Sequence, residues 1–157
     1  MAKKHKTKLP AEHWMHDPQE HDFPAAGNYL SLLAGPSAVE AIVAALKEVP
    51  SETRQAKDLL RASKLELLPA ADFHVALDLK KVAQGDKLSP VLLVRGSLQD
   101  GVPLTIADGY HRICASYHIS ETADIPCRIV DVPLQAPKAP SPRPPAPSRA
   151  NRNPRAT

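Results

Sequence analysis

One short stretch, residues 104–117, constrains the fold most, because it changes from strand-like to helix-like within two residues. Leu104–Ala107 has the β-branched residues Thr105 and Ile106 between Leu104 and Ala107, which predicts a strand. Asp108 and Gly109 interrupt this pattern as a turn, and from Tyr110 onward the apolar spacing is helical. The stretch therefore predicts a strand that ends at a glycine turn and continues directly into a helix.

This strand–turn–helix arrangement is suited to binding an anion. Backbone N–H groups in the first helical turn have no partner inside the helix, and the helix dipole adds partial positive charge there. His111 and Arg112 fall in that turn, and a guanidinium can bind a phosphate with two hydrogen bonds. The pattern predicts a phosphate site, although Asp-Gly is also a common turn and His-Arg also occurs at a solvated helix start.

The rest of the body alternates helical and strand-like segments. Proline, glycine, serine and aspartate mark the expected boundaries. We expect helical turns over 28–33, helices over 36–49, from Ser51 through Leu60 and over 72–82, and strands over 65–68, 91–94 and 125–130, with a hairpin turn at Gln99-Asp100-Gly101. The predicted fold class is α/β (α+β), a small mixed sheet with packed helices.

Composition divides the chain into three parts. Residues 133–157 contain eight prolines, five basic residues and no acid, which predicts a disordered tail. Residues 1–24 are expected to form a flexible arm, and residues 25–132 a single domain whose first part, 25–64, is a helical extension.

Charge also divides unevenly. The body from 9 to 132 carries 11 basic and 17 acidic residues, whereas the charged residues of segments 1–8 and 133–157 are all basic. Weak, non-specific contact with nucleic acid is therefore expected from the tails, and a sequence-reading DNA-binding body is disfavoured. The proline-rich tail is also a candidate ligand for a protein partner.

Other site types receive less support from the sequence. Cys114 and Cys127 lack metal or redox spacing and are expected to be buried free thiols. Several residues near the N-terminus are potential metal ligands, but their spacing fits no defined site: His5, His13, His16, Asp17, His21 and Asp22. No long apolar span is present, so we expect a cytoplasmic protein without membrane contact.

Three segments, taken in order, resemble the ParB/sulfiredoxin superfamily: Leu88–Val91, Asp108–Arg112 and Ile125–Ile129. The resemblance covers about residues 65–130. Its members hold nucleotide phosphates with the turn and the following helix, CTP in ParB-type proteins and ATP with magnesium in sulfiredoxins. The resemblance implies that the ligand is a nucleoside triphosphate with Mg²⁺, contacted by Gly109, Tyr110, His111, Arg112, Lys87 and Ser89.

The chain also departs from both kinds of relative. Sulfiredoxins place a cysteine nucleophile between the glycine and the histidine, where this chain has Tyr110. A phenol, whose ordinary pKa is about 10, cannot replace a reactive thiolate, so sulfinic acid reduction is disfavoured. A complete partition protein needs DNA-binding and dimerisation domains after the nucleotide domain, and here only the proline-rich tail follows.

Asp108 keeps two interpretations open. It is expected to cap the helix, and as a carboxylate beside a phosphate site it is also a candidate catalytic residue or Mg²⁺ ligand. The function predicted from the sequence is nucleotide binding by a single domain. The alternatives are a nucleotide-dependent phosphotransferase, a metal-dependent nuclease and a protein-interaction module without catalysis.

Overall fold

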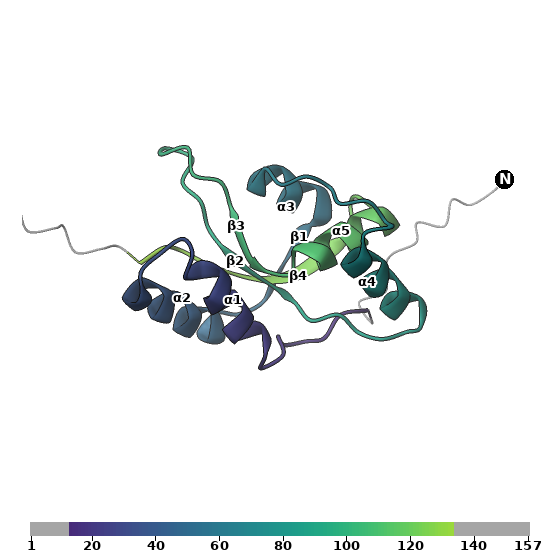
Figure 1. Ribbon diagram of the computed structural model, residues 1–157, viewed down its shortest axis with the longest axis horizontal. Helices are drawn as coiled ribbons and strands as arrows, with labels where there is room; N and C mark the ends of the chain where they lie inside the picture. The colour runs from purple at the N-terminus through teal and green to yellow at the C-terminus, as the bar shows by residue number, and fades with distance from the viewer. Residues whose placement is uncertain (1–12, 134–157) are drawn as a thin grey trace, which may run out of the picture.

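The computed structural model describes residues 13–133 (Figure 1). The described residues form helices α1 (Asp22–Leu30), α2 (Pro36–Glu48), α3 (Ala56–Ser63), α4 (Phe73–Ala83) and α5 (Tyr110–Ile119), and strands β1 (Glu52–Gln55), β2 (Val91–Val94), β3 (Thr105–Asp108) and β4 (Asp124–Val130). The strands make one sheet in the order β1-β4-β2-β3, in which β2 and β4 are parallel and the other pairs are antiparallel. The expected mixed α/β architecture is confirmed.

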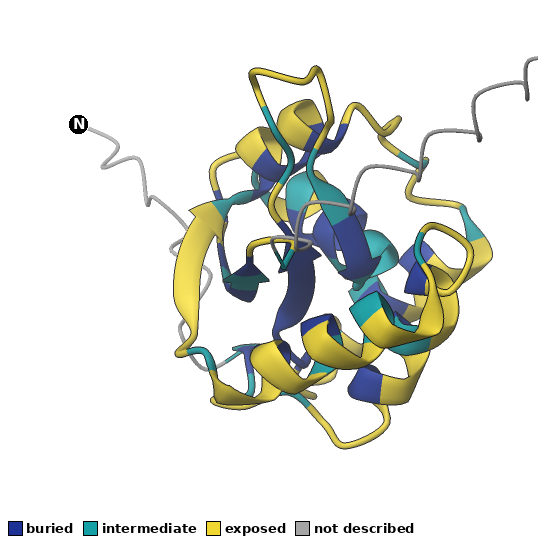
Figure 2. Ribbon diagram, turned by 90° about the vertical axis from the view of Figure 1, so that its left-hand side faces the viewer, coloured by how far each residue is buried: buried dark blue, intermediate teal, exposed yellow. Residues whose placement is uncertain are grey.

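Helices cover both faces of the sheet. All four residues of β2 are buried, as expected for a strand with apolar layers above and below it. Val91 and Leu93 belong to the core with α3, α4 and α5, whereas Leu92 and Val94 belong to the core with α1 and α2. Buried residues gather on the sheet and on the inner helix faces, and the outer helix faces are exposed (Figure 2). The helices of the predicted 25–64 extension thus contribute to both layers.

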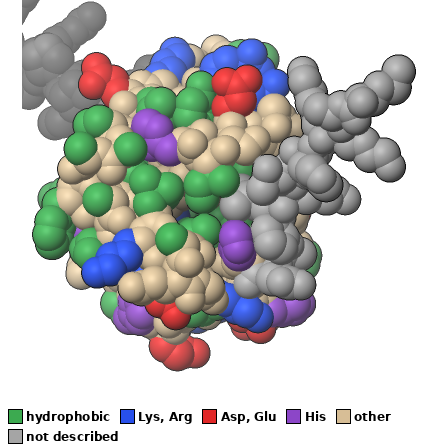
Figure 3. All heavy atoms as spheres, turned by 90° about the vertical axis from the view of Figure 1, so that its right-hand side faces the viewer, with side chains coloured by type: hydrophobic (Ala, Val, Ile, Leu, Met, Phe, Trp, Pro, Cys, Tyr) green, Lys and Arg blue, Asp and Glu red, His purple; other side chains and the backbone are tan. Residues whose placement is uncertain are grey.

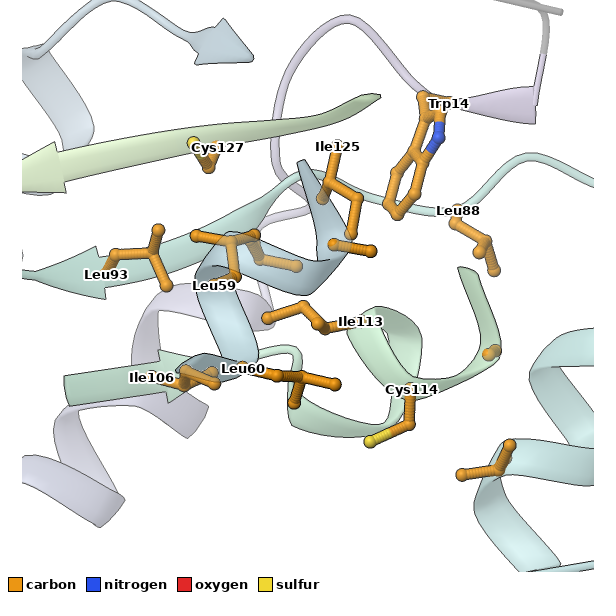
Figure 4. Packing of buried hydrophobic residues seen from close by; sticks show 14 residues of the cluster. Trp14, Leu59, Leu60, Leu88, Leu93, Ile106, Ile113, Cys114, Ile125 and Cys127 are labelled. Atoms are coloured by element: carbon orange, nitrogen blue, oxygen red, sulfur yellow. The ribbon is translucent and has the colours of Figure 1, made fainter. Parts of the chain in front are cut away.

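The first core joins segments that are far apart in the chain. Figure 4 shows Ile113 of α5, Ile125 of β4 and Trp14 pointing into the same space. Ile113 and Ile125 are fully buried and Trp14 is 8% exposed. The N-terminal part of α5 is therefore fixed against the sheet by its own apolar side chains.

Residues 13–22, here called the N-terminal strap, pack on the body instead of forming the end of a flexible arm. Trp14 bridges to Leu88, and the Met15 amide donates to the Leu88 carbonyl at 2.8 Å. Asp17 accepts a hydrogen bond from Arg128 Nη2 at 3.0 Å. Residues 1–12 and the expected tail from residue 134 onward lie outside the described residues.

Two local predictions between α2 and α4 were wrong. Ser51 does not begin a helix but precedes the polar edge strand β1, whose first three residues are exposed and give no hydrophobic pattern. The Ser51 hydroxyl instead accepts from Arg128 Nε at 3.3 Å. Residues 65–68 form no strand, and the carbonyls of Glu66 and Leu68 accept from side chains of α5.

Predictions that depend on local chemistry agree better. Pro36 opens α2, and Asp72 caps α4 by accepting from the His74 and Val75 amides at 3.0 and 3.1 Å. Gly85 has a φ of +81° just after α4. Among the described helices, none combines the length and apolar character needed to cross a membrane.

Candidate functional site

The turn between β3 and α5 requires glycine at position 109. Gly109 has a φ of +112°, in the left-handed region. A Cβ atom there would lie 2.4 Å from Val91 Cγ1 and 2.9 Å from Arg112 Nη2. The missing side chain thus allows the turn to lie directly against β2 and the Arg112 guanidinium.

The N-terminus of α5 differs from that of α4. Asp72 caps α4, whereas no side chain caps α5. The expected cap from Asp108 is therefore wrong. Asp108 Oδ2 instead accepts a hydrogen bond from Arg112 Nη2 at 2.7 Å, so Asp108 does not occupy the N–H groups of the first turn of α5.

Arg112 is bound inside the protein by two carboxylates. Besides Asp108, its Nη1 lies 3.6 Å from Asp22 Oδ1 of the N-terminal strap. The Asp22 side chain is 2% exposed, and the Arg112 side chain is 16% exposed. Arg112 Nε is buried and has no hydrogen-bond acceptor among the described residues. Arg112 therefore links the turn to the strap and keeps one donor unsatisfied.

Burial governs the ionisation of Asp108. It raises the pKa of this carboxyl above 3.8, Arg112 opposes the rise, and the nearby Asp22 adds to it. No group of three or more histidine, cysteine, aspartate or glutamate side chains within residues 13–133 is arranged to hold a metal ion. Since the nearest charged partner of Asp108 is Arg112, these residues alone do not fit a Mg²⁺ site.

The side chains of Tyr110 and Cys114 belong to the packing around α5. The Tyr110 hydroxyl donates to the Glu66 carbonyl, and so ties α5 to the segment before α4. Burial raises the pKa of Tyr110 and also that of Cys114, which is fully buried. Neither group provides a low-pKa nucleophile.

A cavity of about 220 Å³ opens beside the turn. Five of the predicted contact residues line it, namely Gly109, His111, Arg112, Lys87 and Ser89, and so does Asp108. The predicted contact Tyr110 is absent from its lining. The structure thus places the glycine turn and the Lys87–Ser89 segment at the same cavity.

Other residues of this cavity were missed by sequence reasoning. His74, Asp78 and Lys81 come from one face of α4, and Gln19 and His21 come from the N-terminal strap. The spacing of 74, 78 and 81 indicates a shared helical face, but nothing local shows that this face meets α5. Only the packing of α4 against α5 brings these residues to the turn.

The cavity lining carries both signs of charge. Its basic residues are Lys81, Lys87 and Arg112, its acidic residues are Asp78 and Asp108, and three histidines also line it: His21, His74 and His111. Asp78 lies 3.8 Å from Lys81, and Asp108 is paired with Arg112. Burial raises the pKa of Asp78 above 3.8, against the opposing effect of Lys81 and of three other pocket residues. Lys87 forms no ion pair within residues 13–133. The end of the molecule that bears α4 shows histidine and basic side chains among apolar and acidic ones (Figure 3).

Comparisons with family models, with curated proteins and with solved structures give no match for this chain.

Proposed function

We propose that the protein binds the phosphate groups of a nucleotide in the cavity in front of α5. The observation that carries this proposal is an uncapped helix N-terminus that opens beside Gly109 into a cavity lined by Lys87 and His111. Unpaired N–H groups, a cation and an imidazole are the donors that bind phosphate oxygens. Arg112 also lines the cavity, where its guanidinium lies beside Asp108 and Asp22.

The size of the cavity indicates how a nucleotide would lie. Its volume of about 220 Å³ is below the roughly 300–1,000 Å³ of pockets that enclose a drug-sized ligand. We therefore expect the phosphate chain inside and the nucleoside at the rim. Mg²⁺, if required, would arrive bound to the phosphates, since one to two protein carboxylates are enough for such a site.

The resemblance to the ParB/sulfiredoxin superfamily supports the same ligand class, CTP or ATP. Catalysis has less support than binding, because Asp108, the candidate catalytic carboxylate, is held by Arg112 at 2.7 Å. Phosphotransfer or metal-dependent nuclease activity would need this pair to open. The interaction-module alternative rests on the tail, which lies outside the described residues.

The test is a thermal-shift and calorimetry panel of CTP, ATP, GTP, ADP and pyrophosphate, each with and without Mg²⁺. A ligand at about 100 times its Kd stabilises the folded state by about 2.7 kcal/mol, which is a shift of several degrees in Tm. Lys87→Ala should weaken binding about tenfold or more, since a charge-assisted contact contributes about 1.5–3 kcal/mol. Lys80→Ala is the matched control, because Lys80 is an exposed lysine of α4 that does not line the cavity.

Binding that is lost in Lys87→Ala and kept in Lys80→Ala would support the proposal. The proposal is wrong if none of the nucleotides or pyrophosphate binds, or if both lysine variants bind as well as the unaltered protein.

A further inference from the structure

Two histidines from different helices meet at the cavity. The rings of His74 in α4 and His111 in α5 have centroids 4.8 Å apart and are tilted by 47°. Each is the second residue of its helix, and both line the cavity. His74 is exposed and His111 is half-buried, so core packing does not explain the pair.

Their position makes the charge of this pair dependent on the ligand. Histidine is the ordinary side chain that changes charge between about pH 5 and 8. Two imidazolium rings at this distance repel each other, and the positive ends of two helices oppose the same charges. A tetrahedral anion placed beside both rings would reverse this balance, because it attracts both charges and accepts their N–H groups.

We propose that His74 and His111 form a proton-dependent anion clamp, which binds a doubly charged phosphate or similar tetrahedral group and takes up protons as it does so. This inference rests on the proposed function and adds the residues that determine the class of anion. A terminal phosphate with two negative charges is favoured over a phosphodiester with one, because only the former balances two charged rings.

The other charged groups around the pair do not remove this dependence. Asp72 caps the helix that carries His74, and Asp108 and Asp22 are held by Arg112. The remaining charged or titratable groups that line the cavity are Asp78 and Lys81 of α4, Lys87 of the following loop and His21 of the strap. The carboxylates make protonation of the rings easier, and the lysines and Arg112 make it harder.

Sulfate is the appropriate probe, because its own charge does not change between pH 6 and 8. We expect its affinity, measured by calorimetry at pH 6, 7 and 8, to fall about tenfold per pH unit as pH rises, with heats that depend on the buffer's ionisation enthalpy. In NMR titrations, sulfate should move the midpoints of two histidine ring signals to higher pH. His74→Gln and His111→Gln should each remove one of these signals and flatten the pH dependence.

His16→Gln is the matched control, since His16 is exposed and lies outside the cavity lining, and it should change nothing. Affinity that is independent of pH, or a slope unchanged in both glutamine variants, would overturn the clamp. If nucleotides still bound in a manner sensitive to Lys87→Ala, the proposed function would stand without it. If neither sulfate nor any nucleotide bound at any pH, both would fall.

Discussion

Replacing Arg112 with alanine would remove the cation that holds two carboxylates at the turn. Asp22 is 2% exposed, and its Oδ1 lies 3.6 Å from Arg112, while Asp108 Oδ2 lies at 2.7 Å. Removing one partner of a buried ion pair costs about 3–5 kcal/mol, because the other charge stays buried without compensation. Since the Arg112 and Asp108 side chains keep 16% and 20% exposure, we expect about 3 kcal/mol and a fall in Tm on the order of 10 °C.

The pH dependence of this loss identifies its cause. Burial already raises the pKa of Asp108 in the folded protein, and without Arg112 the rise must be larger. A carboxyl with a raised folded pKa contributes stability at low pH, and this contribution is lost as pH rises through that pKa. The stability difference between the unaltered protein and Arg112→Ala should therefore be largest near pH 7 and shrink as pH falls below the folded pKa of Asp108.

Urea unfolding at pH 7 and at about pH 4, followed by circular dichroism, measures both quantities. Asp22→Asn in the Arg112→Ala background should recover part of the stability, because it removes one uncompensated charge. The asparagine keeps a side-chain oxygen that can accept from the Gln19 backbone N–H. The reasoning is refuted if Arg112→Ala costs less than about 1 kcal/mol, the contribution of a surface pair, or if the loss is the same at both pH values.

Three further changes test other parts of the same region. Gly109→Ala should lower the free energy of unfolding in urea by about 2–4 kcal/mol, because Gly109 has a left-handed backbone and a Cβ there would overlap Val91. Gly85→Ala, where φ is +81° but nothing lies within 4 Å of the added Cβ, should lower it by only about 1 kcal/mol. Equal losses would contradict the close approach of Gly109 to Val91. Asp78→Asn should raise Tm at pH 7 and lose this advantage near pH 3, because burial raises the pKa of Asp78 and its ionised form destabilises the fold; a lower Tm at pH 7 would show that the pair with Lys81 outweighs burial. Asp72→Ala should cost about 1 kcal/mol and Asp72→Asn much less, as measured by thermal unfolding, since asparagine also caps a helix; equal losses would argue against capping.

Much of the local structure could be predicted because its causes lie within a few residues. The Asp108–Gly109 turn separates β3 from α5 as expected, Asp72 caps α4, and Pro36 opens α2. In each case the decisive interaction joins a residue to its immediate neighbours, as in a cap or a left-handed turn. These features therefore appear in the sequence as short patterns.

Other elements could not be predicted because their stability comes from distant partners. Strand β1 is polar and mostly exposed, and it is a strand because it pairs with β4. The N-terminal strap looks like a polar arm in sequence, yet Trp14 pairs with Leu88 and Asp17 binds Arg128. No periodicity within either segment indicates these contacts.

The candidate site likewise has some features that local sequence predicts and others that only tertiary packing sets. The sequence by itself determined that a glycine turn opens a helix with His111 and Arg112 in its first turn, because backbone conformation and helix periodicity are local properties. Only the tertiary structure decided that Arg112 faces Asp22 and Asp108 and that His74 joins His111 at the cavity. Which charges are neutralised and which face a ligand depends on distances of a few ångströms between segments remote in the chain, and the packing of the helices on the sheet sets those distances.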